Sequence, residues 1–130
     1  MRRCQGGDMG KRVLVIEDEA NISEALNFIL SRDGWDVCTH ADGTDALDIV
    51  ADCAPDLVIL DVMLPGRSGF EILQALRARP QTSALPVLLL TAKGQSADRE
   101  LAGQFDGTRF MTKPFANSDV VQAVRDLAGS

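Results

Sequence analysis

Short runs of consecutive apolar residues alternate along the chain with segments whose apolar residues recur every three or four positions. The run Leu57–Leu60 ends directly in Asp61, and the turn signal Pro65-Gly66 follows soon after. Such uninterrupted runs predict strands buried on both faces, whereas the wider spacing predicts helices. The predicted strands occupy 11–16, 36–40, 57–61, 86–91 and 109–112. The predicted helices occupy 21–31, 44–53, 68–79, 96–104 and 118–127.

The strict alternation of these elements predicts five βα units and an α/β fold. In such a fold a parallel sheet is covered by helices on both faces, with right-handed crossovers. The second strand is the most polar and is expected at an edge of the sheet, and Gly34 is expected to end the first helix. We expect one domain over residues 11–128, preceded by a flexible leader at 1–10.

Composition and charge exclude several classes of function. The chain has 130 residues, of which 45% are hydrophobic and 25% charged, as in soluble globular proteins. A net charge of −6 disfavours direct binding to nucleic acid or to anionic membranes. No apolar run approaches the roughly 18 residues of a membrane span. No apolar segment follows Arg2 and Arg3 to make a secretory signal, so a cytoplasmic location is expected.

The chain contains three cysteines, Cys4, Cys38 and Cys53, and a single histidine, His40. The cysteines are odd in number, widely spaced and form no C-x-x-C motif. This pattern favours buried or incidental thiols in a reducing compartment over a redox or metal-binding role.

Polar residues stand at the carboxyl ends of four predicted strands. Glu17 and Asp18 follow the first strand and Asp61 ends the third. Thr91 ends the fourth strand, and Lys113 comes just after the fifth. Because the carboxyl ends of parallel strands share one edge of the sheet, we expect these side chains to gather there.

Three clustered carboxylates need a neutralising partner, since two negative charges ~4 Å apart repel by ~4 kcal/mol at an effective dielectric near 20. Mg²⁺ prefers oxygen ligands and suits one or two carboxylates together with an incoming phosphate. A carboxylate beside a metal and Lys113 is a potential nucleophile toward phosphorus. Thr91 could then donate a hydrogen bond to a phosphoryl oxygen.

Each of these residues also has a simpler interpretation when it is taken alone. Asp61 could be a turn residue, and Glu17 and Asp18 could be acids favoured at a helix N-terminus. Thr91 could be an ordinary β-branched strand residue, and Lys113 a solvated loop lysine. Their joint placement favours the functional interpretation.

Four motifs resemble the receiver domain of bacterial two-component response regulators, of the chemotaxis-regulator type. They are VLVIEDE at 13–19, DLVILDVMLPGRSG at 56–69, LLLTA at 88–92 and MTKPF at 111–115. The resemblance covers about residues 11–128. It implies a flavodoxin-like three-layer sandwich with strand order 2-1-3-4-5.

The resemblance also implies roles for particular residues. Asp61 corresponds to the phosphoacceptor, and the metal ligands to Glu17, Asp18, Asp61 and the backbone carbonyl of Met63. Lys113 and Thr91 correspond to the residues that contact the phosphoryl group. The switch residues are then Thr91 and Phe110. The segment 105–110 departs from the family pattern, because its glycine stands one place later than usual.

The implied function is Mg²⁺-dependent acceptance of a phosphoryl group from a sensor histidine kinase or a histidine phosphotransfer protein. The change in conformation would then control an effector protein or an output domain, and a phosphorylation-dependent homodimer is allowed. Beyond its own phosphorylation and dephosphorylation the chain is not expected to be an enzyme. Two alternatives stay open: a phosphatase or phosphotransferase with an aspartyl nucleophile, and an interaction module whose site is vestigial.

Overall fold

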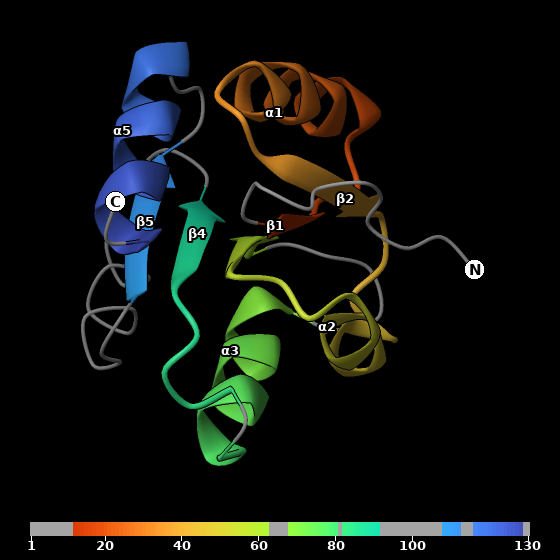
Figure 1. Ribbon diagram of the computed structural model, residues 1–130. Helices are drawn as coiled ribbons and strands as arrows, with labels where there is room; N and C mark the ends of the chain where they lie inside the picture. Colours follow the sequence, from red (N-terminus) through yellow and green to blue (C-terminus); the bar gives the residue numbers. More distant parts are fainter. Residues whose placement is uncertain (1–11, 63–67, 81, 92–107, 113–115, 129–130) are drawn as a thin grey trace.

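The computed structural model describes residues 12–62, 68–80, 82–91, 108–112 and 116–128 of the chain (Figure 1). The described strands are β1 (Arg12–Ile16), β2 (Asp36–His40), β3 (Leu57–Asp61), β4 (Val87–Thr91) and β5 (Thr108–Thr112). The described helices are α1 (Ala20–Arg32), α2 (Ala46–Cys53), α3 (Gly69–Ala78) and α5 (Asn117–Ala128). None of these helices is long and apolar enough to cross a membrane.

The strands form one parallel sheet in the order β2-β1-β3-β4-β5. The predicted α/β flavodoxin-like class and the order 2-1-3-4 are therefore confirmed, and β5 pairs with β4. The prediction that the polar second strand lies at an edge is also correct, because among the described strands β2 has only β1 beside it. The helix predicted at 96–104 lies outside the described residues, so the full count of five βα units stays a prediction.

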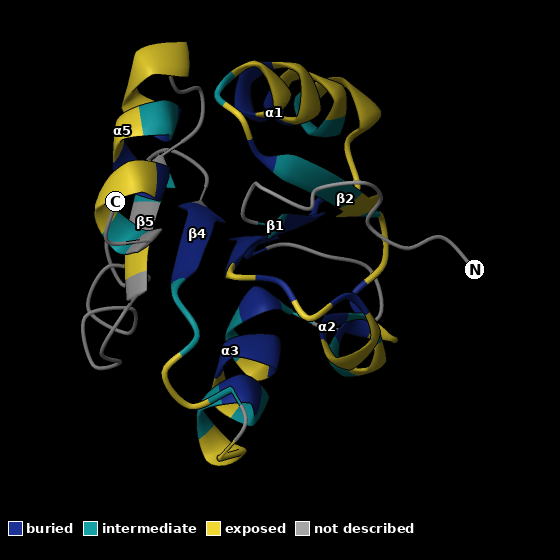
Figure 2. Cartoon of the chain, viewed as in Figure 1, coloured by how far each residue is buried: buried dark blue, intermediate teal, exposed yellow. Residues whose placement is uncertain are grey.

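The described helices cover both faces of the sheet. In Figure 1, α1 and α5 lie on one side and α2 and α3 on the other. Alternate residues of the central strands face opposite layers, so the core divides into two apolar clusters. Leu14 and Leu60 belong to the cluster under α2 and α3, and Val15 and Ile59 to the cluster under α1 and α5. Figure 2 shows the buried residues concentrated in the central strands and on the inner faces of the helices.

The end of α1 follows the prediction from Gly34. Gly34 has φ 96°, a conformation that glycine adopts without the steric cost of a side chain. The chain turns there, and the Trp35 amide donates to the Leu30 carbonyl across 3.0 Å. Trp35 then packs under α1 and starts the turn into β2. The glycine thus directs the chain back along the sheet.

The helix predicted from residue 44 begins two residues later, at Ala46. The Asp42 carboxylate accepts a hydrogen bond from the Thr44 amide at 2.7 Å, which holds this stretch in a turn. The start of α3 is a capping box. The Glu71 amide donates to the Ser68 hydroxyl, and the Ser68 amide donates to the Glu71 carboxylate.

Candidate functional site

Three acidic residues converge at the carboxyl ends of β1 and β3. Ile16 is the last residue of β1 and pairs with Leu60 of β3. The next residue of each chain segment, Glu17 and Asp61, therefore lies beside the other. Asp18 follows Glu17. One carboxylate oxygen from each of Glu17, Asp18 and Asp61 lies within 4.8 Å of the others. This is the only group of three such ligands among the described residues that could hold a metal ion.

Burial makes this cluster electrostatically demanding. Glu17 is 1% exposed and Asp61 3% exposed, whereas Asp18 is open to solvent. Glu17 and Asp18 also line a surface pocket of about 450 Å³, together with residues of α1 and the end of β2. Buried like charges at this separation raise the energy of the site unless a cation or a proton compensates them. A hard divalent cation with oxygen ligands suits the arrangement.

Two hydrogen bonds hold Glu17 in place. Its amide donates to the His40 carbonyl of β2 at 2.9 Å, and its carboxylate Oε2 accepts from the Glu19 amide at 3.1 Å. Glu19 is the N-cap residue of α1 and its own side chain makes no capping bond. The Glu17 carboxylate therefore lies against the N-terminal end of α1. The same side chain supports the helix and belongs to the acidic cluster.

Gly69 lets α3 start against the end of β3, a feature that the sequence analysis missed. Its amide donates to the Val62 carbonyl at 2.9 Å. A Cβ atom at this position would lie 2.5 Å from the Asp61 carbonyl oxygen and 2.9 Å from the Val62 Cα. No larger residue fits without a backbone shift at Asp61. The Ser68-x-x-Glu71 capping signal could have indicated that α3 starts at residue 69, but not the close approach of this residue to Asp61.

The other predicted site residues are described in part or not at all. Thr91 ends β4 one residue after Leu90, the partner of Asp61, so its backbone lies at the same edge of the sheet. Phe110 lies in β5 and pairs with Leu89. The proposed roles of the Thr91 and Phe110 side chains stay predictions. Met63 and Lys113 lie outside the described residues.

The prediction of buried or incidental free thiols is wrong for Cys38 and Cys53, because neither is free. Cys38 of β2 and Cys53 at the end of α2 contact each other, with their Sγ atoms 3.4 Å apart. The sequence could not indicate this pair, because 15 positions separate its members and no motif marks them. Cys4 lies outside the described residues.

A parallel α/β sheet in the order 2-1-3-4, with its candidate ligand site at the carboxyl ends of the central strands, places the chain in the flavodoxin-like class of doubly wound proteins. The family model for the response regulator receiver domain matches residues 13–125. The chain therefore belongs to the response regulator receiver domain family of two-component signalling. Domains of this family are signalling modules rather than conventional enzymes, and they interact with histidine kinases or phosphotransfer proteins.

Solved structures agree with this assignment. A response regulator receiver domain protein from Clostridium thermocellum is 30% identical, with a TM-score of 0.82 over 92% of this chain and 94% of that chain. The chemotaxis response regulator CheY4 of Vibrio cholerae is 27% identical, with a TM-score of 0.84 over 92% and 99%.

A third structure holds a metal. It is the receiver domain of the sensor histidine kinase PA1611 from Pseudomonas aeruginosa PAO1, with a magnesium ion coordinated in its active-site cleft. It is 26% identical, with a TM-score of 0.83 over 93% of this chain and 99% of that chain.

Proposed function

We propose that this chain accepts a phosphoryl group on Asp61 from a phosphohistidine of a kinase or phosphotransfer protein. The observation that carries the proposal is the convergence of Glu17, Asp18 and Asp61 within 4.8 Å, with two of the three buried. The receiver domain is assigned to residues 11–128. It acts in the cytoplasm and controls a partner or output domain.

Mg²⁺ is the cation that this site is proposed to hold. Glu17, Asp18, Asp61 and the carbonyl of Met63 would be its protein ligands. When bound, the ion neutralises negative charge on the cluster and on the phosphoryl oxygens. The magnesium in the PA1611 receiver supports this choice by similarity.

Asp61 is the proposed nucleophile. A carboxylate oxygen of Asp61 attacks phosphorus in line as the bond to the histidine nitrogen breaks, which gives an aspartyl phosphate and a free imidazole. Burial of Asp61 keeps bulk water away from the reacting oxygen. Lys113 is proposed to contact the phosphoryl oxygens.

The aspartyl phosphate is proposed to shift a two-state equilibrium. The Thr91 hydroxyl donates a hydrogen bond to an oxygen of the new phosphoryl group, and the Phe110 side chain repacks when Thr91 moves. Both residues lie on β4 and β5, the strands on the opposite side of β3 from β2. The segment that includes β5 and α5 would therefore present the change to an effector.

Intact-mass measurement after incubation with a small phosphodonor tests the proposal. With Mg²⁺ present, the wild type should gain the mass of one phosphoryl group, and chelation of the metal should prevent the gain. Asp61→Asn should gain nothing. Asp48→Asn is the matched control, because Asp48 is an exposed aspartate on α2. Equal labelling of the Asp61→Asn variant and the wild type would contradict the assignment.

The same assay distinguishes the alternatives. A phosphatase or phosphotransferase would turn over many equivalents of a phosphomonoester, whereas a receiver would leave the phosphomonoester unconsumed. The second aspartate that such enzymes carry two residues after the nucleophile is replaced here by Met63. A vestigial interaction module would show no Mg²⁺-dependent labelling at all.

A further inference from the structure

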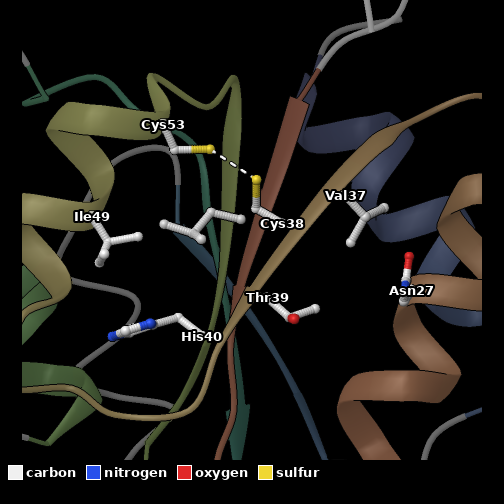
Figure 3. A pocket seen from close by; sticks show the side chains of 8 residues that line it. Asn27, Val37, Cys38, Thr39, His40, Ile49 and Cys53 are labelled. Atoms are coloured by element: carbon white, nitrogen blue, oxygen red, sulfur yellow. Dashed lines mark hydrogen bonds between the residues drawn. The ribbon is translucent and has the colours of Figure 1, made fainter. Parts of the chain in front are cut away.

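Cys38 and Cys53 meet on the α2 side of the edge strand. Figure 3 shows Cys38 and His40 pointing from β2 toward α2, whereas Val37 and Thr39 point to the opposite side. The Sγ atoms of the two cysteines are 3.4 Å apart, at one side of a pocket of about 440 Å³. Cys53 is 3% exposed and Cys38 is half-buried, so Cys38 is the more exposed residue of the pair.

β1 fixes the position of both cysteines. Cys38 pairs in register with Leu14. The Cys53 carbonyl accepts a hydrogen bond from the Arg12 guanidinium at 2.9 Å, and Ala54 closes α2 in a left-handed conformation with φ 51°. The two sulfurs are therefore brought together by one strand. They are not placed by a flexible loop.

The surroundings favour sulfur chemistry over metal binding. Soft metal sites of this kind use three or four ligands. Among the described residues, the only group of three possible metal ligands is the acidic cluster, which excludes both cysteines. A cysteine pair with no third ligand is suited to reversible oxidation, the use that reducing compartments make of disulfides.

We propose that Cys38 and Cys53 form a reversible disulfide that clamps β2 to α2, with a small disulfide such as oxidised glutathione as the oxidant. The Cys38 thiolate attacks one sulfur of the oxidant and releases one thiol. The Cys53 thiolate then attacks the Cys38 sulfur and releases the second thiol. The protein loses two protons and two electrons, and the oxidant becomes two thiols.

The clamp would act on the strand that supports the acidic cluster. Of the described strands only β1 pairs with β2, and β2 ends at His40, whose carbonyl accepts a hydrogen bond from the Glu17 amide. Edge strands open locally more readily than central strands. Tying β2 to α2 through Cys38 should therefore slow the opening that exposes the Glu17 amide.

The chemistry can be tested by mass spectrometry in a Cys4→Ser background, which removes the third thiol. Oxidised glutathione should remove the mass of two hydrogen atoms from the folded protein, and dithiothreitol should restore it. Adding Cys53→Ser should stop the reaction at one glutathione adduct on Cys38, whereas adding Cys38→Ser should abolish it.

Cleavage before aspartate then locates the bond. Asp42, Asp45, Asp48 and Asp52 lie between the cysteines, so the two cysteine peptides stay joined only if the disulfide is present. An absent crosslink in the folded protein, or one that forms only between chains, would overturn the proposal.

Hydrogen exchange tests the clamp separately. Exchange of the β2 amides and of the Glu17 amide should slow by about threefold or more in the oxidised protein, while β4 stays unchanged. The Cys38→Ser variant should show no change under the same treatment. If oxidation forms the bond and these amides exchange at the same rate, the disulfide does not act as a clamp.

Discussion

The central strand β3 and the edge strand β2 both end at the carboxyl side of the sheet, but they differ in burial and in strand pairing. All five residues of β3 are buried, and β3 pairs with β1 and β4. No residue of β2 is fully buried, and within the described part of the chain β2 pairs with β1 alone. β3 ends in the acid Asp61, whereas β2 ends in His40, whose carbonyl supports Glu17.

This difference shows that one sheet can hold a reactive side chain rigidly at the end of its central strand while its edge strand stays free to adjust. A strand packed on both faces and paired on both sides holds its last residue where the core places it. An edge strand is held less firmly by its neighbours, so a covalent bond such as the proposed disulfide should stabilise it more than it would a central strand. Substitutions in one strand, or in the turn that follows it, test this contrast.

The largest expected effect follows from Gly69→Ala, at the point where α3 meets the end of β3. The new Cβ would lie 2.5 Å from the Asp61 carbonyl oxygen, so the backbone at Asp61 must move. We expect a loss of about 3 kcal/mol in the free energy of unfolding, measured with urea, and strongly reduced phosphoryl labelling.

Gly34→Ala is the control for backbone strain without a steric clash. Its new Cβ would meet nothing within 4 Å, but φ 96° is unfavourable for any residue with a side chain. It should cost about 1 kcal/mol and leave labelling unchanged. Normal labelling of Gly69→Ala would show that the close approach does not position Asp61.

The same substitution in each strand measures the contrast directly. Val58→Ala in β3 removes buried methyl groups and should cost about 2 kcal/mol, from lost burial and the cavity left behind. Val37→Ala in β2 should cost under ~1 kcal/mol, because Val37 is only half-buried. Urea denaturation of both variants provides the comparison. Equal losses would mean that the edge strand is as firmly packed as the centre.

The capping box after β3 should contribute a smaller amount. Ser68→Ala removes the hydroxyl that accepts from the Glu71 amide, and we expect a loss of about 1 kcal/mol in thermal or urea unfolding. Ser31→Ala, an exposed serine on α1, should change stability by less than ~0.5 kcal/mol. A Ser68→Ala protein as stable as the control would show that the cap does not hold α3.

The turn after β2 should contribute least to stability, and its contribution should depend on pH. The hydrogen bond from the Thr44 backbone amide lowers the pKa of Asp42 from its usual 3.8, with a further contribution from the Thr44 side chain. A lowered carboxyl pKa stabilises the fold above the unfolded value, and this contribution is lost as pH falls through the folded value. NMR titration of the Asp42 carboxyl should therefore give a midpoint below 3.8. A midpoint at or above that value would mean that the turn does not form in solution.

The sequence predicted the features that depend on local pattern. Four apolar residues in a row indicated the buried strand that delivers Asp61, and the weaker pattern at 36–40 indicated an edge. The acidic cluster followed from the common edge of parallel strands. These inferences need only strand direction and burial.

Features that depend on distant segments could not be predicted. The space beside Gly69 is set by how α3 packs against Asp61, which no local pattern encodes. Cys38 and Cys53 meet because β2 pairs with β1 while Arg12 holds the end of α2. The later start of α2 reflects the competing turn at Asp42, where a side-chain hydrogen bond replaces the first helical turn.

The most direct test of the central claim is to locate the phosphoryl group within the labelled chain. Borohydride reduction of the labelled protein converts an aspartyl phosphate to homoserine, and fragmentation of the tryptic peptide 33–67 identifies the position. That peptide carries several other aspartates, including Asp48 and Asp56, which serve as internal controls. We expect homoserine at 61 alone, and only when Mg²⁺ was present during labelling. Homoserine at another aspartate, or none after verified donor consumption, would contradict it.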